Sequence, residues 1–323
     1  MTKITRITLT MLLIIISVAA VGYYFWNQDN HENTDYNPIN DFTKIDDYPL
    51  YTAMYVGDYR FSEYLNTGTR PRLSGIGCTC FTVDGLLFGR NFDFPSNPAL
   101  LLWTSPMGGY KSVSMVDLGY FGYSLENHPL DTTGLEETPY MPFDGMNEKG
   151  LVVAMAAIPY ADAPESPDKA SIGEIAVIRL LLDYAANVDA AVELLSEYNV
   201  EMTTPPIHYL IADPSGESVI IEFLDGEMKQ YWSNEPQIMT NFLVTGVSLP
   251  EDSPCQRYDS VYSGIIDNEE SMSVEYAFTL LESSSQSSTI WSTVYDMENL
   301  TVHVAMGRDY SDIYSFELMK SDS

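Results

Sequence analysis

Residues 77–93 read GCTCFTVDGLLFGRNFD, and the interpretation of the whole chain begins from this stretch. Two runs rich in apolar and β-branched residues, 78–83 and 86–89, flank the dipeptide Asp84-Gly85. An Asp-Gly pair between two such runs suits the tight primed turn of a β-hairpin. The sequence therefore predicts two antiparallel strands that meet at Asp84-Gly85.

This hairpin brings a thiol close to a cation. A two-residue turn places Cys78 opposite Asn91, with Arg90 next along the strand, whereas a three-residue loop is expected to place Arg90 directly opposite Cys78. A nearby cation lowers the pKa of a thiol, and the thiolate is the nucleophilic form. Asp93 follows Arg90 by three residues, so a bulge or strand end must aim both side chains at one site. Taken alone, the hairpin is better explained by a buried cysteine beside a surface salt bridge.

Composition excludes several classes of protein. The chain has 323 residues, of which 45% are hydrophobic, enough for one substantial core. Its net charge of −31 excludes a nucleic-acid-binding protein, because no excess of Lys or Arg can neutralise phosphates. Three cysteines form neither a disulfide framework nor a zinc signature, so we expect no metal and no organic cofactor. The histidines are scattered and receive no catalytic role: His31, His128, His208 and His303.

The N-terminal region carries a targeting signal. Lys3 and Arg6 precede the uncharged segment 7–26, whose 20 residues are enough to span a bilayer as a helix and end in Tyr-Tyr-Phe-Trp. No Lys or Arg follows until Lys44, so the positive-inside rule places the rest of the chain outside the cytoplasm. We expect a membrane anchor at residues 1–26. A cleaved signal peptide, with small residues at 17–20, is the alternative and makes the protein secreted.

The rest of the chain divides into a stalk and a catalytic domain. Residues 27–77 are expected to form a stalk and a pro-segment-like region, with a helix or two in 42–65. In residues 78–323 a second hairpin is predicted at 207–212 and 218–223. Ser171 and Glu174 have capping-box spacing ahead of an apolar helical face, and Asp189 is expected to cap a following helix. Strands on both sides of these helices predict an α+β protein with antiparallel sheets.

Seven motifs in a fixed order resemble those of the choloylglycine hydrolases. This family of linear amide C–N hydrolases includes bile-salt hydrolases and penicillin V acylases and is related to acid ceramidase. The motifs are Cys78-Thr79, GRNFD at 89–93, DGMNEKGL at 144–151, HYLIAD at 208–213, Thr240-Asn241, CQRY at 255–258 and STVYD at 292–296.

The resemblance implies an N-terminal-nucleophile (Ntn) hydrolase fold, a four-layer αββα sandwich with two antiparallel sheets. It also implies an enzyme that hydrolyses linear amides in small N-acyl substrates through a cysteine acyl-enzyme. Cys78 is then the nucleophile and, once the Gly77-Cys78 bond is cut, the supplier of its own α-amino base. Arg90 stabilises the thiolate, and Asp93 holds the α-amino group. Asn241 donates to the oxyanion, and Arg257 completes the charged ring.

Two features of the chain leave alternatives open: a second cysteine near Cys78, and Ala157 at a position where relatives have an Asn. Cys80 points to the same face as Cys78 and is the rival nucleophile, whereas Cys255 is interpreted as buried packing. Bile-salt hydrolases carry a further oxyanion-hole Asn where this chain has Ala157, although a backbone N–H can serve there. An acyltransferase with the same site, and a non-catalytic surface binding protein with the same fold, are the alternative functions.

Overall fold

The hairpin at residues 77–93 belongs to a six-stranded sheet. The computed structural model describes residues 38–67, 77–203, 205–268 and 272–318. In this sheet the strands lie in the order β14-β3-β4-β15-β16-β17, and every pairing is antiparallel. The bounds are β3 Gly77–Val83, β4 Leu87–Asp93, β14 Ile238–Met239, β15 Thr289–Asp296, β16 Thr301–Met306 and β17 Ile313–Glu317.

The hairpin is confirmed, but the strand register differs from both alternatives considered. Three residues, 84–86, connect the strands, and Asp84 and Gly85 both adopt positive φ values. As a result Val83 pairs with Leu87, Cys80 pairs with Arg90, and Cys78 pairs with Phe92. Cys78 therefore faces neither Asn91 nor Arg90 directly. Cross-strand partners lie on the same face of a sheet, so both cysteines share a face with Arg90.

A nine-stranded sheet forms the second layer of strands. Its order is β1-β2-β5-β6-β7-β8-β11-β12-β13, and only the β2–β5 pairing is parallel. The bounds are β1 Ile39–Lys44, β2 Leu50–Tyr55, β5 Ala99–Thr104, β6 Ser112–Asp117, β7 Asp144–Asn147, β8 Val152–Ala157, β11 Ile207–Ala212, β12 Ser218–Leu224 and β13 Glu227–Ser233. β11 and β12 confirm the second predicted hairpin. A separate parallel pair joins β9 (Ala170–Gly173) to β10 (Tyr198–Glu201).

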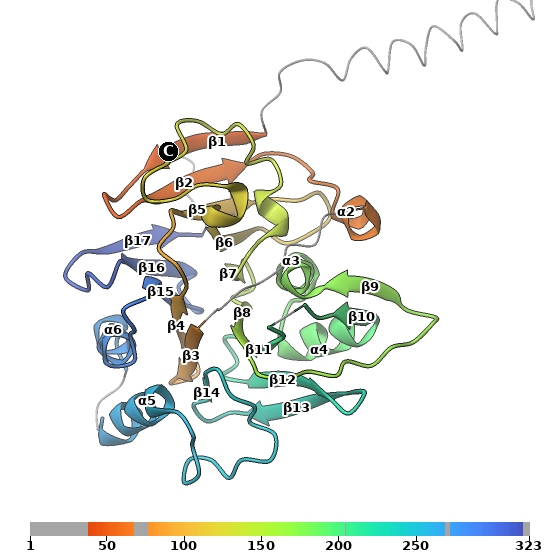
Figure 1. Cartoon of the computed structure of the whole chain (residues 1–323), viewed down its shortest axis with the longest axis vertical. Helices are drawn as coiled ribbons and strands as arrows, with labels where there is room; N and C mark the ends of the chain where they lie inside the picture. The colour runs from red at the N-terminus through yellow and green to blue at the C-terminus, as the bar shows by residue number, and fades with distance from the viewer. Residues whose placement is uncertain (1–37, 68–76, 204, 269–271, 319–323) are drawn as a thin grey trace, which may run out of the picture. The chain divides into compact units, whose positions relative to one another are not determined.

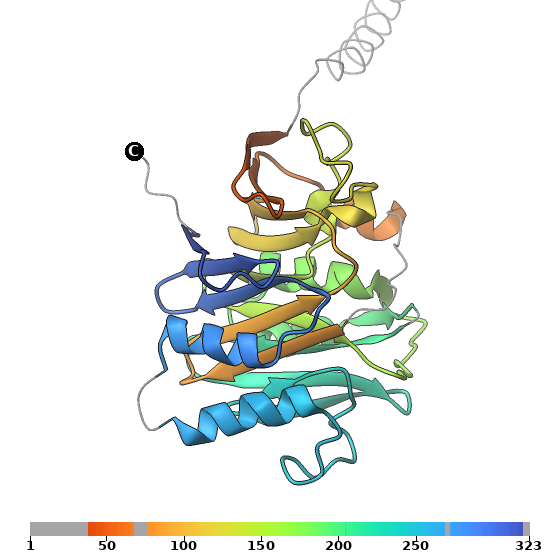
Figure 2. The same cartoon turned by 60° about the vertical axis from the view of Figure 1, so that its left-hand side comes forward.

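Helices cover the outer faces of the two sheets. α3 (Glu174–Tyr184) and α4 (Val188–Ser196) pack on the nine-stranded sheet, and α5 (Gln256–Asp267) and α6 (Val274–Ser283) pack on the six-stranded sheet (Figure 1). Figure 2 shows α6 in front of β3 and β4, with α5 below it. Short helices lie at α2 (Phe61–Thr67), η1 (Leu118–Phe121) and η2 (Thr138–Tyr140). The predicted αββα sandwich is confirmed.

The segment before Cys78 is more regular than the sequence indicated. Residues 42–65 were expected to form helices, but residues 39–55 form β1 and β2 of the nine-stranded sheet and only 61–67 is helical. The compact unit begins at Ile39 rather than at Cys78. Pairing with β5, which lies more than 40 residues downstream, drives this segment into strands, and no local pattern reveals such a partner.

Two predicted helix starts are also shifted. Ser171 lies in β9, because residues 170–173 pair with β10, and α3 begins three residues later behind Gly173. α4 is capped by Asn187, whose side chain accepts a hydrogen bond from the amide of Ala190, and Asp189 lies in its first turn. The pairing of β9 with β10 delays the start of α3, and Asn187, a good N-cap residue, starts α4 earlier than predicted.

The predicted anchor at 1–26 lies outside the described residues, as do residues 27–37 and 68–76 of the predicted stalk and pro-segment-like region. Within the ranges that the structure describes, no helix is long and apolar enough to cross a membrane.

Leu50 tests whether the segment before Cys78 is part of the folded body. Its side chain is fully buried in β2. We expect Leu50→Ala to lower the free energy of unfolding by about 2–5 kcal/mol, the usual cost of a buried Leu→Ala change. Leu130→Ala is the control, because Leu130 is 96% exposed, and it should change stability by less than about 0.5 kcal/mol. Equal unfolding transitions for the two variants, measured by denaturant titration, would contradict the assignment.

Candidate active site

Cys78 lies in β3 of the six-stranded sheet, and its side chain is fully buried. The Nη2 atom of Arg90 donates a hydrogen bond to the Cys78 Sγ at 3.3 Å. A cation at this distance favours the thiolate over the thiol. Although Cys80 pairs with Arg90 across the hairpin, the donated hydrogen bond goes to Cys78. The geometry therefore supports Cys78 over Cys80 as the nucleophile.

Arg90 is held in place by the nine-stranded sheet. Its Nη1 atom donates to the carbonyl oxygen of Phe143 at 2.7 Å, and its Nε atom lies 3.0 Å from Oδ2 of Asp144. Both charged side chains are fully buried. Trp291 and Tyr295 of β15 donate their side-chain N–H and O–H to the same Asp144 carboxylate. Asp144 belongs to the DGMN motif, but its pairing with Arg90 was not predicted.

Asn241 and Arg257 contact the backbone of Cys78. The Cys78 amide donates to Oδ1 of Asn241 at 2.8 Å, and Arg257 donates to the Cys78 carbonyl oxygen. Nη2 of Arg257 also donates to Oδ1 of Asn241 at 2.7 Å. The Nδ2 atom of Asn241 donates to the Ala157 carbonyl oxygen at 2.8 Å, so Ala157 takes part through its backbone.

Asp93 ends β4 on the side of α5 and α6. Its carboxylate accepts hydrogen bonds from Thr289 and Gln286 and lies 3.6 Å from Nη1 of Arg257. The irregularity expected near Asp93 is present: it is both the last residue of β4 and opposite a bulge in β15, between Thr289 and Trp291. A Cβ on Gly77 would meet Asp93 at 3.0 Å and Gln286 at 2.9 Å. The residue before Cys78 is thus packed against this carboxylate, and Gln286 and Thr289 are contacts that the sequence did not reveal.

Burial makes the Cys78 thiol a weak acid. It raises the pKa of the thiol to about 11, because desolvation outweighs the stabilising charges of Arg90 and Arg257, and Asp93 acts in the same direction as burial. The thiol is therefore protonated at neutral pH while the peptide bond before it is intact. Attack on an amide at that pH needs a base that removes this proton.

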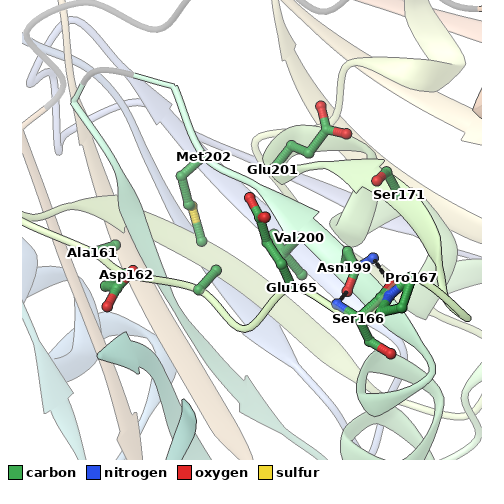
Figure 3. Close-up of a pocket in the computed structure, with 11 residues that line it drawn as sticks. Ala161, Asp162, Glu165, Ser166, Pro167, Ser171, Asn199, Val200, Glu201 and Met202 are labelled. Atoms are coloured by element: carbon green, nitrogen blue, oxygen red, sulfur yellow. Dashed lines mark hydrogen bonds between the residues drawn. The ribbon is translucent and has the colours of Figure 1, made fainter. Parts of the chain in front are cut away.

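A surface groove of about 770 Å³ lies along residues 161–167, β9 and β10 (Figure 3). It is lined by Asp162, Glu165, Glu201 and Met202 among others, and Asn199 and Ser166 are hydrogen bonded to each other in its wall. None of the five candidate site residues lines this groove. The groove is therefore separate from the chemistry at Cys78.

Comparison with known proteins identifies the family. The family model described as linear amide C–N hydrolases, choloylglycine hydrolase family, matches residues 78–242, which is half of the chain and starts at Cys78. The chain belongs to this family. The predicted membership in the linear amide C–N hydrolases is thus confirmed.

Individual relatives agree with this membership. The choloylglycine hydrolase chain described here is 27% identical over 189 residues to a penicillin V acylase of Pectobacterium atrosepticum. This match covers 51% of the chain and 49% of the acylase, so the chain spans about half the length of that relative. The penicillin V acylase of Agrobacterium tumefaciens is 18% identical, with a TM-score of 0.57 over 76% of this chain and 87% of the acylase. A mutant conjugated bile acid hydrolase of Clostridium perfringens is 16% identical, with a TM-score of 0.56 over 76% and 93%. The two structures share the fold.

The structure brings together all five residues singled out in the sequence: Cys78, Arg90, Asp93, Asn241 and Arg257. Their individual catalytic roles stay predictions. Cys255 is only partly buried and precedes α5, so it is not simple core packing. In the part of the chain that the structure describes, no His, Cys, Asp and Glu group could hold a metal ion.

The pH dependence of thiol labelling tests the environment of Cys78. Tryptic peptides that span Gly77-Cys78 report on the uncut chain alone. With a pKa of about 11, roughly one thiol in a thousand is ionised at pH 8, so iodoacetamide labelling should rise about tenfold per pH unit from pH 8 to 10. Arg90→Met should slow labelling at each pH, because the stabilising cation is lost.

Arg179→Met is the matched control for this experiment. Arg179 is also a fully buried arginine, but it pairs with Asp183 on α3. Labelling of Cys78 that is independent of pH between 8 and 10, or that slows equally in both arginine variants, would contradict the assigned role of Arg90.

Proposed function

We propose that this chain is a cysteine N-terminal-nucleophile amidohydrolase that cleaves the linear amide bond of a small N-acyl compound. The observation that supports this most directly is the contact of four polar groups with one residue, Cys78. Arg90 contacts its sulfur, Asn241 its amide, and Arg257 its carbonyl oxygen, while Asp93 lies beside the residue that precedes it. A binding protein of the same fold has no need for this set.

The proposed reaction starts with cleavage of the Gly77-Cys78 bond. An α-amino group has a reference pKa of about 7.7–8.0 and can accept the thiol proton near neutrality. This base is what the buried thiol lacks in the uncut chain. Asp93 is suited to hold the new ammonium group, because Gly77 already packs against its carboxylate. Removal of the peptide before Cys78 thus supplies the base, and Asp93 supplies its counter-charge.

The chemistry then follows in two steps. The Cys78 sulfur attacks the substrate carbonyl carbon, and the thiol proton passes through the α-amine to the departing amine nitrogen as the C–N bond breaks. The acyl group stays on sulfur as a thioester. Asn241 is placed to donate to the oxyanion of each tetrahedral intermediate. Water next attacks the thioester, the C–S bond breaks, and the acid and the free thiol are released.

We further propose that the catalytic domain lies outside the cytoplasm, tethered through residues 7–26. The length of this apolar segment and the basic residues before it support the proposal. Release into the medium after cleavage of residues 1–26 as a signal peptide is the alternative outcome, which N-terminal sequencing of the mature chain distinguishes.

A substrate screen tests the proposed activity. We expect hydrolysis of at least one compound among N-acyl amino acids, bile-salt conjugates, penicillin V and acyl-homoserine lactones, with Cys78→Ala as the inactive blank. Asn241→Ala should lower kcat about 10²–10³-fold, the usual loss for one oxyanion donor. Added amines that divert product into new amides would indicate acyl transfer instead. Equal activity of wild type and Cys78→Ala on every substrate would sink the proposal.

Mass spectrometry of the purified full chain tests the cleavage. We expect fragments 1–77 and 78–323, with no cleavage in Cys78→Ala and normal cleavage in Cys80→Ala, the matched control. The two fragments should elute together on gel filtration and separate only in denaturant, because β2 pairs with β5 across the cleaved bond. Active protein that contains only the intact Ile76-Gly77-Cys78 sequence would rule cleavage out.

A further inference from the structure

A buried histidine–glutamate pair lies next to the candidate site and has no role in the proposed reaction. His208 of β11 and Glu222 of β12 face each other on neighbouring antiparallel strands, with Nδ1 of His208 3.2 Å from Oε1 of Glu222. Both side chains are fully buried. Buried charges are costly unless they are paired and hydrogen bonded, so the other partners of this pair show what it does.

Those partners all belong to one irregular segment, residues 240–245. The carbonyl oxygen of Thr240 lies 2.7 Å from Nε2 of His208. On the other side, Glu222 accepts hydrogen bonds from the Val244 amide at 2.7 Å and from both the amide and hydroxyl of Thr245, at 3.0 and 2.6 Å. His208 and Glu222 are therefore hydrogen bonded to this segment on both sides of Asn241.

This segment has no regular structure of its own. It follows the two-residue strand β14 and forms neither helix nor strand. Backbone groups outside regular structure need partners from elsewhere when they are buried. Here the side chains of two strands of the nine-stranded sheet supply them, so the position of Asn241 relative to Cys78 depends on His208 and Glu222.

The contacts also fix the orientation of the imidazole. Nδ1 faces a carboxylate oxygen of Glu222, and Nε2 faces the carbonyl oxygen of Thr240. Both ring nitrogens are thus occupied, and the ring cannot turn without losing its contact to β12 or to residues 240–245. Hydrogen bonds to charged groups are stronger than those between neutral groups, so the bonds that Val244 and Thr245 donate to the Glu222 carboxylate hold this segment firmly.

We propose that His208 and Glu222 are positioning residues that hold Asn241 in register with Cys78 and Arg257. This inference rests on the proposed function for its kinetic consequences, but the geometry it describes can be measured without turnover. A displacement of about 1 Å at a catalytic group can cost 10²-fold in rate. Loss of the pair is therefore expected to affect the chemical step rather than substrate binding.

Kinetics on the full chain give the first test, with His208→Phe and Glu222→Gln as variants. We expect kcat to fall about 100-fold in each, while KM changes less than about threefold. Asp183→Asn is the matched control, since it breaks a similarly buried ion pair with Arg179 within α3. The control should lower the thermal midpoint but leave kcat unchanged. A loss of kcat that tracks thermal midpoint across all three variants would overturn the proposal, because the pair would then be merely structural.

Side-chain amide NMR gives the second test and does not need activity. In full-length chain labelled with ¹⁵N-asparagine, the Asn241 NH₂ signals are assigned by their disappearance in Asn241→Asp. We expect these signals to shift in His208→Phe and Glu222→Gln and to stay in place in Asp183→Asn. If the wild type hydrolyses no substrate but the shifts occur, the proposed function fails and the positioning role stands. Unchanged Asn241 signals in both pair variants would overturn the positioning role itself.

Discussion

The buried guanidinium of Arg90 is the constraint on which the site depends. It joins β4 of one sheet to Asp144 of the other and at the same time donates to the Cys78 sulfur. An unpaired charge at this depth would cost several kcal/mol, and the Asp144 carboxyl group is the ion-pair partner of Arg90. Burial raises the pKa of Asp144, and Arg90 opposes that rise. Stability of the sheet packing and placement of the thiol are thus set by the same ion pair.

The surroundings of Cys78 come from segments that are far apart in the chain. Asn241 follows β14, and Arg257 lies in the first turn of α5, whereas Asp93 ends β4. Each reaches Cys78 because a sheet edge or helix end fixes the direction of its backbone. The hydrogen bonds of Asn241 to Ala157 and Arg257 then connect the segment after β14 to β8 and to α5. Such a site has little freedom to adjust, which suits a reaction that needs preorganised donors.

Local sequence signals were enough for the two hairpins, and the ordered motifs were enough for the family and for a set of five residues that the structure brings together, whose roles stay predictions. Local sequence signals failed where a strand pairs with a distant partner, and where one residue more in a loop changes the strand register. The three-residue loop at 84–86 moved the register so that Cys78 faces Phe92, a difference that Asp84-Gly85 alone does not determine. Residues 50–55, within the segment predicted to be helical, form β2 because they pair with the remote strand β5. The contacts of Asp144 and Gln286 depend on tertiary packing and leave no pattern in the sequence.

The depth of Cys78 has opposite effects on its two possible states. In the uncut chain, burial keeps the thiol protonated and inert, since its pKa is about 11. Exposure of the α-amine at Cys78 would place a base on the same residue without moving the sulfur away from Arg90. The segment before Cys78 is anchored independently, through β2 in the nine-stranded sheet. Cutting one bond could therefore convert a resting thiol into a nucleophile while the sheets, and the contacts they position, stay as they are.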